Sequence, residues 1–265
     1  MTLTTHTSTV ARSSSQARLR HFRANDLQAV RDLFRTAVDT GKGSARRDML
    51  KRQRFDTTNL LFYSLIVGGG FHWFWAPIMP VSSSLPLAIG TMGGLLAIFA
   101  IAAFAYRRTM VSNIYTRFSD QSLASSDLQD LIGHYQFKSI NAPGDNHGEI
   151  ELGSDDARGF WVVELEGEVV GCAGLDLHKN QPTHGDLRRM AVSPDHRRYG
   201  IGKLLMNKIM DRAREYKLES VSLSTPVYQI PARRLYESYD FVEERRWVDR
   251  EGLCAVSVLY YRCEL

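Results

Sequence analysis

The segment Asp186–Met206 combines arginines, two glycines and a helix start in a pattern that suits anion binding. The apolar run up to Val192 is typical of a strand, and the run from Gly202 places its apolar residues on one helical face. Between them lies Arg197–Gly202, with the sequence Arg-Arg-Tyr-Gly-Ile-Gly. Glycines before a helix expose backbone N–H groups, and the helix dipole favours a negative charge. The loop therefore predicts a phosphate site; the alternative is an ordinary connection with solvated arginines.

The overall composition excludes few functions. The 265 residues suffice for one large domain with an appendage or for two small domains. A formal charge of +4 is slight for this length, so nothing indicates nucleic-acid binding. The three cysteines are widely spaced in apolar runs, which favours reduced, buried thiols over a disulfide framework or a metal site.

Residues 1–18 are rich in serine and threonine and contain no acidic residue. This composition is typical of a disordered tail. A mitochondrial presequence has the same composition, but no apolar helical face is visible here. We therefore expect a disordered tail and keep the presequence as the alternative.

An uncharged run extends from Thr57 to Tyr106. Its two arms, 59–79 and 85–106, are each long enough to cross about 30 Å of hydrocarbon as a helix. A buried core hairpin is the alternative, but such a hairpin normally has a polar face, and neither arm does. We expect a transmembrane helical hairpin. Basic residues within 46–54 and 107–117 flank it, which predicts that both of its ends lie on the cytosolic side.

Periodicity and turn residues predict the other elements. Glu166-Gly167 between two apolar runs is a strong β-hairpin pattern. Asn25-Asp26 can cap a helix whose apolar stripe includes Phe34 and Val38. We expect a strand at 19–22, a polar helix over 119–132, loops at 141–156 and 179–185, strands at 159–165, 168–177, 186–192, 220–225, 241–247 and 255–262, and helices at 202–214 and 231–239.

The order of these elements and two local patterns resemble the GNAT acetyltransferase superfamily. The loop Arg197–Gly202 fits that family's acetyl-CoA pattern, (Arg/Gln)-x-x-Gly-x-(Gly/Ala), at all three defined positions. The segment Ala232–Phe241 is similar to its downstream pattern Ala-x-x-Leu-Tyr-x-x-x-Gly-Phe, except that Asp240 replaces the glycine. Because aspartate tolerates left-handed conformations, we expect an adjusted turn there.

A narrower resemblance points to a membrane-anchored subfamily. This subfamily contains the endoplasmic-reticulum cysteine-conjugate N-acetyltransferases and the aspartate N-acetyltransferase. Thr225, Gln229, the segment Ala232–Tyr236, the core Arg189–Val192 and the hairpin carry this resemblance. It covers roughly residues 19–247 and does not fix the substrate.

The resemblance implies an α+β fold of the GNAT type: a mixed, mostly antiparallel sheet flanked by helices, with an inserted two-helix transmembrane hairpin. It also implies an intracellular membrane, the endoplasmic reticulum, as the location, a lipid bilayer as partner, and a catalytic domain that faces the cytosol. The expected domains are a disordered tail (1–18), the first strand and helix of the GNAT domain (19–56), the hairpin (57–106) and the remainder of the GNAT domain (107–265).

The implied reaction is direct transfer of acetyl from acetyl-CoA to a primary amine, without a metal. Backbone N–H groups from Arg198 to Lys203 can bind the pyrophosphate, and the side chains of Arg197 and Arg198 add positive charge. Pantetheine can pair with the strand backbone at 190–192, where one N–H can stabilise the oxyanion. The expected acetyl-CoA-binding residues are Met190, Ala191, Val192, Arg197, Arg198, Tyr199, Gly200, Ile201, Gly202, Lys203 and Gln229.

Asp186 and Tyr236 are the expected catalytic residues. An ammonium nucleophile must lose a proton, and Asp186 occupies the strand position where many family members place a general base; a salt bridge with an arginine is the alternative. Such an aspartate needs burial or a water relay to become basic enough. His184 is the second candidate base, and Glu164 and Asp176 are weaker ones.

Tyr236 matches the family's general-acid tyrosine, which protonates the departing thiolate; the alternative is a half-buried aromatic. Gln229 and Thr225 could orient substrate or CoA. No motif pairs a cysteine with a base, so we expect no cysteine nucleophile.

The acceptor stays open at this point. A small amino-acid-like amine or a cysteine conjugate is the first expectation. Lysines of proteins near the membrane are the alternative acceptor, and a non-catalytic acyl-CoA-binding scaffold is the rival function. Residues 145–156 and 179–185 are expected on the acceptor side but show no readable specificity code.

Overall fold

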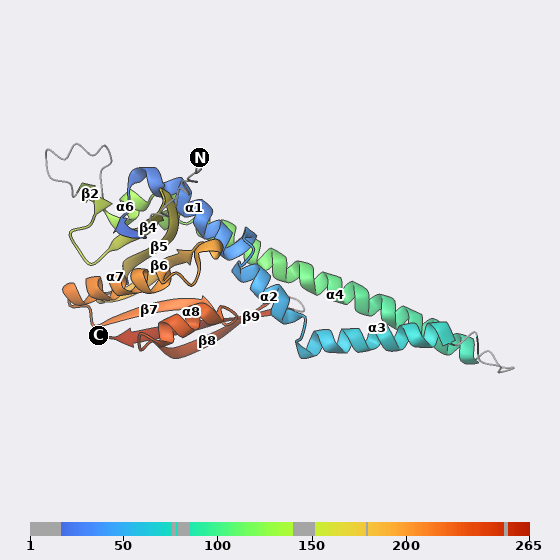
Figure 1. The fold of residues 1–265 in the computed structure, drawn as a ribbon. Helices are drawn as coiled ribbons and strands as arrows, with labels where there is room; N and C mark the ends of the chain where they lie inside the picture. Colours follow the sequence, from blue (N-terminus) through green and yellow to red (C-terminus); the bar gives the residue numbers. More distant parts are fainter. Residues whose placement is uncertain (1–16, 76–77, 79–84, 140–151, 179, 252–253) are drawn as a thin grey trace, which may run out of the picture.

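The computed structural model describes residues 17–75, 78, 85–139, 152–178, 180–251 and 254–265. Its main sheet has seven strands in the order β1-β4-β5-β6-β7-β9-β8 (Figure 1). Neighbouring strands are antiparallel except β6 and β7, which run parallel, so the predicted mixed, mostly antiparallel sheet is confirmed. The strands are β1 (Arg18–His21), β4 (Gly159–Leu165), β5 (Glu168–His178), β6 (Gln181–Val192), β7 (Ser220–Pro226), β8 (Val242–Glu251) and β9 (Cys254–Glu264), and a separate pair is β2 (Lys138–Ser139) and β3 (Leu152–Gly153).

Helices cover both faces of this sheet, which explains why β4 and β5 are apolar at nearly every position. Trp161 and Val163 of β4 belong to the core cluster that contains the buried face of α7. Phe160 and Val162, one residue out of step, belong to the cluster that contains α1. The helices are α1 (Leu27–Arg35), a π-helical turn (Thr36–Thr40), α2 (Ala45–Gln53), α3 (Thr57–Trp75), α4 (Leu85–Leu123), α5 (Ser126–Gln129), α6 (Leu131–Tyr135), α7 (Ile201–Glu215) and α8 (Ile230–Glu237), with short 3-10 turns at Ala24–Asp26 and Pro194–His196.

The predicted β-hairpin is present. Glu166 and Gly167 adopt φ angles of +53° and +85° between β4 and β5. Two consecutive positive φ angles are those of a type I′ turn, which matches the twist of the two strands.

Strands β6 and β7 pair over three residues only and then separate. His184–Asp186 pairs with Ser220–Ser222. Further along β6, Arg189 has a φ of +53°, and the register with β5 shifts between Cys172 and Gly174, which marks a β-bulge. The bulge bends β6 away from β7 and leaves a gap between the two strands.

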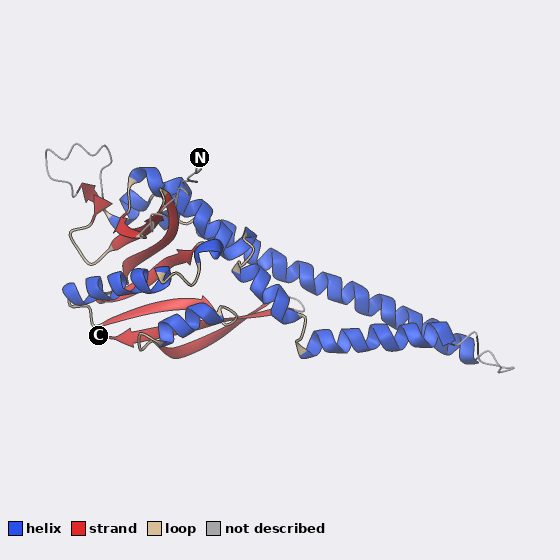
Figure 2. Ribbon diagram, viewed as in Figure 1, coloured by secondary structure: helices blue, strands red, loops and turns tan. Residues whose placement is uncertain are grey.

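Helices α3 and α4 pack along each other and extend away from the sheet (Figure 2). Their contact is close because a Cβ on Gly69 would meet the backbone of Gly93 at 2.2 Å, and one on Gly94 would meet the ring of Trp73 at 2.5 Å. Among the described residues, one helix, over Ala88–Leu123, is long and apolar enough to cross a membrane, and only 17% of its most apolar stretch is buried. Large apolar side chains stand exposed along both helices, among them Leu61, Val67, Phe74, Met92, Leu95, Ile98 and Phe99.

Several sequence expectations are wrong. Residues 181–185 belong to strand β6 and not to a loop, and the stretch 119–132 is not one helix, because α4 runs to Leu123 and α5 and α6 follow. Asp26 stands at the N-cap position of α1, as the sequence predicts, but its side chain makes no capping hydrogen bond; the carboxylate binds Arg20 instead, at 2.6 Å. The tail ends earlier than expected, since Arg18 begins β1. Most of the expected loop 141–156 and residues 1–16 lie outside the described residues.

Candidate active site

The gap between β6 and β7 opens into a cavity of about 390 Å³. Strands β6 and β7 and helix α8 form one side of it, and α1, the π-helical turn and α4 form the other. It brings together five residues that the sequence singled out: Asp186, Met190, Thr225, Gln229 and Tyr236. The other lining residues are Phe34, Val38, Phe118, Gln121, Ser122, Leu187, Arg188, Arg189, Leu223, Ser224 and Pro226.

The backbone of β6 presents an unpaired edge to this cavity. Ala191 and Val192 pair with β5 on one side, opposite Cys172 and Gly171. The β7 side of β6 has ladder partners only at 184–186 among the described residues. An extended, amide-containing chain can hydrogen-bond to such an edge as an added strand. The backbone next to Met190 therefore offers an edge of this kind at the cavity, and Ala191 and Val192 continue the same strand.

The loop between β6 and α7 forms a turn that exposes backbone N–H groups. Arg198 and Gly200 have φ angles of +70° and +79°, and α7 begins immediately afterwards at Ile201. The first-turn N–H groups of a helix have no partner within it, and they attract anions. Side chains of Arg198, Tyr199 and Lys203 are exposed around this turn.

Two contacts hold this turn in place. A Cβ on Gly202 would come within 3.1 Å of the Leu235 side chain of α8, so the helix start packs closely there. The Arg197 guanidinium donates to the carbonyl of Gly43, in the segment that joins the π-helical turn to α2. The loop is thus anchored to elements on both sides. The sequence could not predict the role of Gly43, because the contact uses its backbone carbonyl and the two residues are 154 positions apart in the sequence.

The Asp186 carboxylate lies on the wall of the cavity. Its side chain is 39% exposed, and its Oδ2 is 3.7 Å from Nε of Arg188, too far for a hydrogen bond. Burial raises the pKa of Asp186; the charges of Arg188, His178 and Arg189 oppose this, and that of Asp176 adds to it. A raised pKa makes a carboxylate a better base near neutral pH.

Tyr236 lies deeper, on α8, where it packs against Phe241 and Tyr261. Burial raises the pKa of Tyr236 to about 12. The phenol therefore keeps its proton at neutral pH and can donate it. Thr225 and Gln229, the residues expected to orient substrate or CoA, lie close together, with their side-chain oxygens 3.3 Å apart.

The other candidate bases lie outside the cavity lining and have structural partners. His184 lies 2.8 Å from Arg262 and 3.0 Å from Thr183. Glu164 accepts a hydrogen bond from buried Arg20 at 2.7 Å. Asp176 lies on the neighbouring strand and binds His134 and Arg188.

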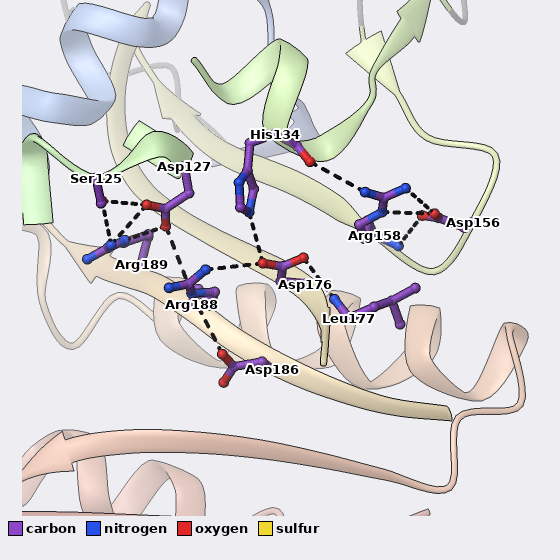
Figure 3. A network of polar contacts seen from close by, with 10 residues as sticks. All are labelled: Ser125, Asp127, His134, Asp156, Arg158, Asp176, Leu177, Asp186, Arg188 and Arg189. Carbon is purple, nitrogen blue, oxygen red and sulfur yellow. Dashed lines mark hydrogen bonds and ion pairs between the residues drawn. The ribbon is translucent and has the colours of Figure 1, made fainter. Parts of the chain in front are cut away.

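A buried ionic network supports the bulge of β6 (Figure 3). Arg189 donates to both carboxylate oxygens of Asp127, at 2.7 and 3.0 Å, and to Ser125 at 2.8 Å. Burial alone would raise the pKa of Asp127, but the hydrogen bonds from Arg189 and Ser125 outweigh it and lower this pKa to about 2. The pair fixes a non-glycine residue at positive φ. The sequence gives no signal for it because its partners are 62 residues apart.

In the described part of the chain, neither the Cys172 thiol nor the Cys263 thiol is placed for nucleophilic chemistry. Cys172 and Cys263 are free and buried. Burial raises the pKa of the Cys172 thiol to about 12, so it is inert at neutral pH. Within the same described residues, no group of three or more His, Cys, Asp or Glu side chains is arranged to hold a metal ion.

Known proteins are similar to this chain in sequence. The model of the acetyltransferase (GNAT) family matches residues 126–241. A probable N-acetyltransferase camello of Xenopus tropicalis is 35% identical over 32% of this chain and 39% of its own length. N-acetyltransferase 8 of Homo sapiens is 29% identical over 63% of this chain and 69% of its own length. N-acetylaspartate synthetase of Rattus norvegicus is 27% identical over 84% of this chain and 62% of its own length.

The matched segment contains the bulged strand, the turn before α7 and Tyr236. The chain spans between 39% and 69% of the length of these relatives. By its match to the family's model, the segment 126–241 is an acetyltransferase domain of the GNAT family.

Proposed function

We propose that this chain is a membrane-anchored N-acetyltransferase that moves acetyl from acetyl-CoA directly to a primary amine of a small amino-acid-like or cysteine-conjugate substrate. The observation that carries the proposal is the single cavity that joins an unpaired strand edge, a carboxylate with a raised pKa and a protonated tyrosine. Each of these groups meets one chemical need of amine acetylation.

Two backbone segments of the chain hold acetyl-CoA. The backbone edge at Met190–Val192 holds the pantetheine arm, and one of its N–H groups faces the oxyanion of the tetrahedral intermediate. Losing such a donor typically costs about 3 kcal/mol of barrier. The turn from Arg198 to Lys203, with Arg197 and Gln229, holds the phosphate-bearing end. Acetyl-CoA supplies the activated thioester.

Proton movement involves two side chains. Asp186 takes a proton from the ammonium of the acceptor, directly or through a water, so that the nitrogen lone pair can form the new N–C bond. The C–S bond of the tetrahedral intermediate then breaks as the oxyanion re-forms the carbonyl, and Tyr236 donates its phenolic proton to the departing thiolate. The nitrogen releases its second proton to solvent, and solvent returns a proton to the Tyr236 oxygen.

The charges of the cavity favour an acceptor with an amino group and a carboxylate. The Arg188 side chain is 34% exposed on the same wall as Asp186. A carboxylate of the acceptor can pair with this guanidinium while the amine lies near Asp186. This arrangement supports an amino-acid-like acceptor over an isolated aliphatic amine.

The membrane anchor is proposed from the exposed apolar surface of α3 and α4. Such a surface is unfavourable in water, and basic residues flank the uncharged run. The uncharged run ends just before Arg107 on α4. Phe118, which lines the cavity, lies about 16 Å further along the same helix. The cavity would then stand above an intracellular membrane, that of the endoplasmic reticulum, on its cytosolic side. An acceptor from the cytosol reaches this height more easily than one embedded in lipid.

The test is the release of free CoA by the purified full chain in detergent. Acetyl-CoA is combined with a panel of free amino acids, cysteine S-conjugates and lysine peptides. Turnover with the first two groups supports the proposal, and turnover only with lysine peptides assigns the alternative acceptor. No turnover, with CoA still bound, would assign a scaffold.

A second experiment tests the orientation. Sealed microsomes that contain the full chain are treated with protease without detergent. Digestion of the C-terminal half supports a cytosolic domain, and its protection contradicts one.

A further inference from the structure

A second layer of charged residues lies behind Asp186 (Figure 3). Asp176 on β5 and Asp186 on β6 stand directly opposite each other in the register of the two strands. Two carboxylates in cross-strand positions repel each other unless a cation separates them. Arg188, two residues after Asp186, is that cation.

Arg188 has three carboxylates within reach but hydrogen-bonds only one of them. Its Nη1 lies 3.1 Å from Oδ2 of Asp176. Its Nε lies 3.7 Å from Asp186 and 3.9 Å from Asp127, beyond hydrogen-bonding distance of both. Asp127 is already saturated by the bidentate contact with Arg189. Asp176 is therefore the group that keeps Arg188 from closing onto Asp186.

Asp176 is itself held from the other side. Its Oδ2 lies 2.9 Å from Nε2 of His134, and its Oδ1 accepts the N–H of Leu177 at 2.9 Å. His134 lies on the short helix α6, and Asp130 caps the start of this helix. Tyr135, the residue after His134, is fully buried. The histidine thus fixes the Asp176 carboxylate in the orientation that receives Arg188.

We propose that Asp176, oriented by His134, is a positioning residue for Asp186: it holds Arg188 away from the Asp186 carboxylate and so leaves that carboxylate free to accept the proton of the amine. This inference rests on the proposed function, because it concerns the base of the proposed reaction. Asp186 faces Arg188 and Arg189 from its own strand and Asp176 and His178 from β5.

The proposal predicts shifts of opposite sign for two variants. In Asp176→Asn the like charge is gone and Arg188 is free to pair with Asp186, so both effects lower the pKa of Asp186. In Arg188→Met the opposing cation is gone, so this pKa rises. A purely structural role would reduce activity in both variants without moving their pH profiles in opposite directions.

The experiment measures kcat/KM against pH for the full chain with the best amine of the panel. In Asp176→Asn we expect the acid limb of the kcat/KM profile to lie at lower pH. We also expect its rate at pH 7 to fall about tenfold or more, since a general base contributes about 10²- to 10⁴-fold. In Arg188→Met we expect the limb at higher pH. Asp176→Glu, which keeps the charge, should restore the wild-type limb, and His134→Ala should shift it in the same direction as Asp176→Asn, but less.

Glu164→Gln is the matched control, because it removes a strand carboxylate from an ion pair on β4 that lies outside the cavity lining. It should leave the limb unmoved. Carbon-13 NMR titration of the Asp186 carboxyl, assigned with Asp186→Asn, reads the same shifts without turnover. The proposal is overturned if Asp176→Asn and Arg188→Met shift the acid limb and the titration in the same direction, or if neither variant shifts them. Opposite shifts in the titration of an enzyme that shows no turnover would instead support the positioning and refute the proposed function.

Discussion

Replacement of Gly200 by alanine separates the cost of the left-handed turn from the cost of lost anion binding. Gly200 has a φ of +79°, and a Cβ there would meet nothing within 4 Å, so the substitution introduces no clash. Its cost is conformational, about 1–2 kcal/mol for a left-handed L-residue. If the turn keeps its shape, this cost appears as lost stability. If it relaxes, the cost appears on binding acetyl-CoA, as a dissociation constant about 5- to 30-fold higher.

Gly167→Ala provides the control. Gly167 has a φ of +85° and equally open surroundings, but it lies in the turn between β4 and β5. Thermal unfolding and calorimetric titration with acetyl-CoA measure the two costs. We expect the stability and affinity losses of Gly200→Ala to sum to about 1–2 kcal/mol, and Gly167→Ala to lose stability alone. A Gly200→Ala protein with wild-type stability and affinity would refute the role of this turn.

Further predictions concern three side chains, Tyr236, Asp127 and Arg197. Because the pKa of Tyr236 is about 12, the rate should show no alkaline loss from this residue below about pH 11, and a limb near pH 9 that disappears in Tyr236→Phe would contradict this. Asp127 has a folded pKa of about 2, below its unfolded value, so its contribution of about 2 kcal/mol is present above about pH 4 and is lost as the pH falls towards 2; chemical denaturation of wild type and Asp127→Asn across this range measures it. At pH 7, Asp127→Asn should lose about 3–5 kcal/mol because Arg189 is left unpaired, and a loss below 1 kcal/mol would argue against the pair. Arg197→Ala should raise the KM for acetyl-CoA while leaving the KM for the amine unchanged, and the reverse pattern would place the arginine on the acceptor side.

The sequence indicates the parts of the site that depend on local backbone geometry. The turn at 197–202 is readable because glycines before an amphipathic helix allow few other structures. Tyr236 is readable because its helix carries a family pattern. The β4–β5 hairpin follows from Glu166-Gly167, whose positive φ angles the structure confirms.

Contacts between distant residues could not be read in this way. The stretch 181–185 has the composition of a loop, yet pairing with β5 and β7 makes it a strand. Nothing local predicts that Arg189 adopts a positive φ, because Asp127 stabilises it from another element. Helix α4 continues past the apolar run because residues 107–123 contain neither glycine nor proline, and its last turns supply Phe118 to the cavity.

The most direct test of amine acetylation at this cavity is a paired measurement on wild type, Asp186→Asn and Tyr236→Phe. Free CoA and the acetylated amine are quantified in the same reaction, and acetyl-CoA binding is measured separately. For wild type we predict equal amounts of both products. For each variant we predict a kcat that is lower by at least about 10²-fold and an unchanged affinity for acetyl-CoA. Wild-type turnover in both variants, or CoA release without acetylated amine, would contradict the account.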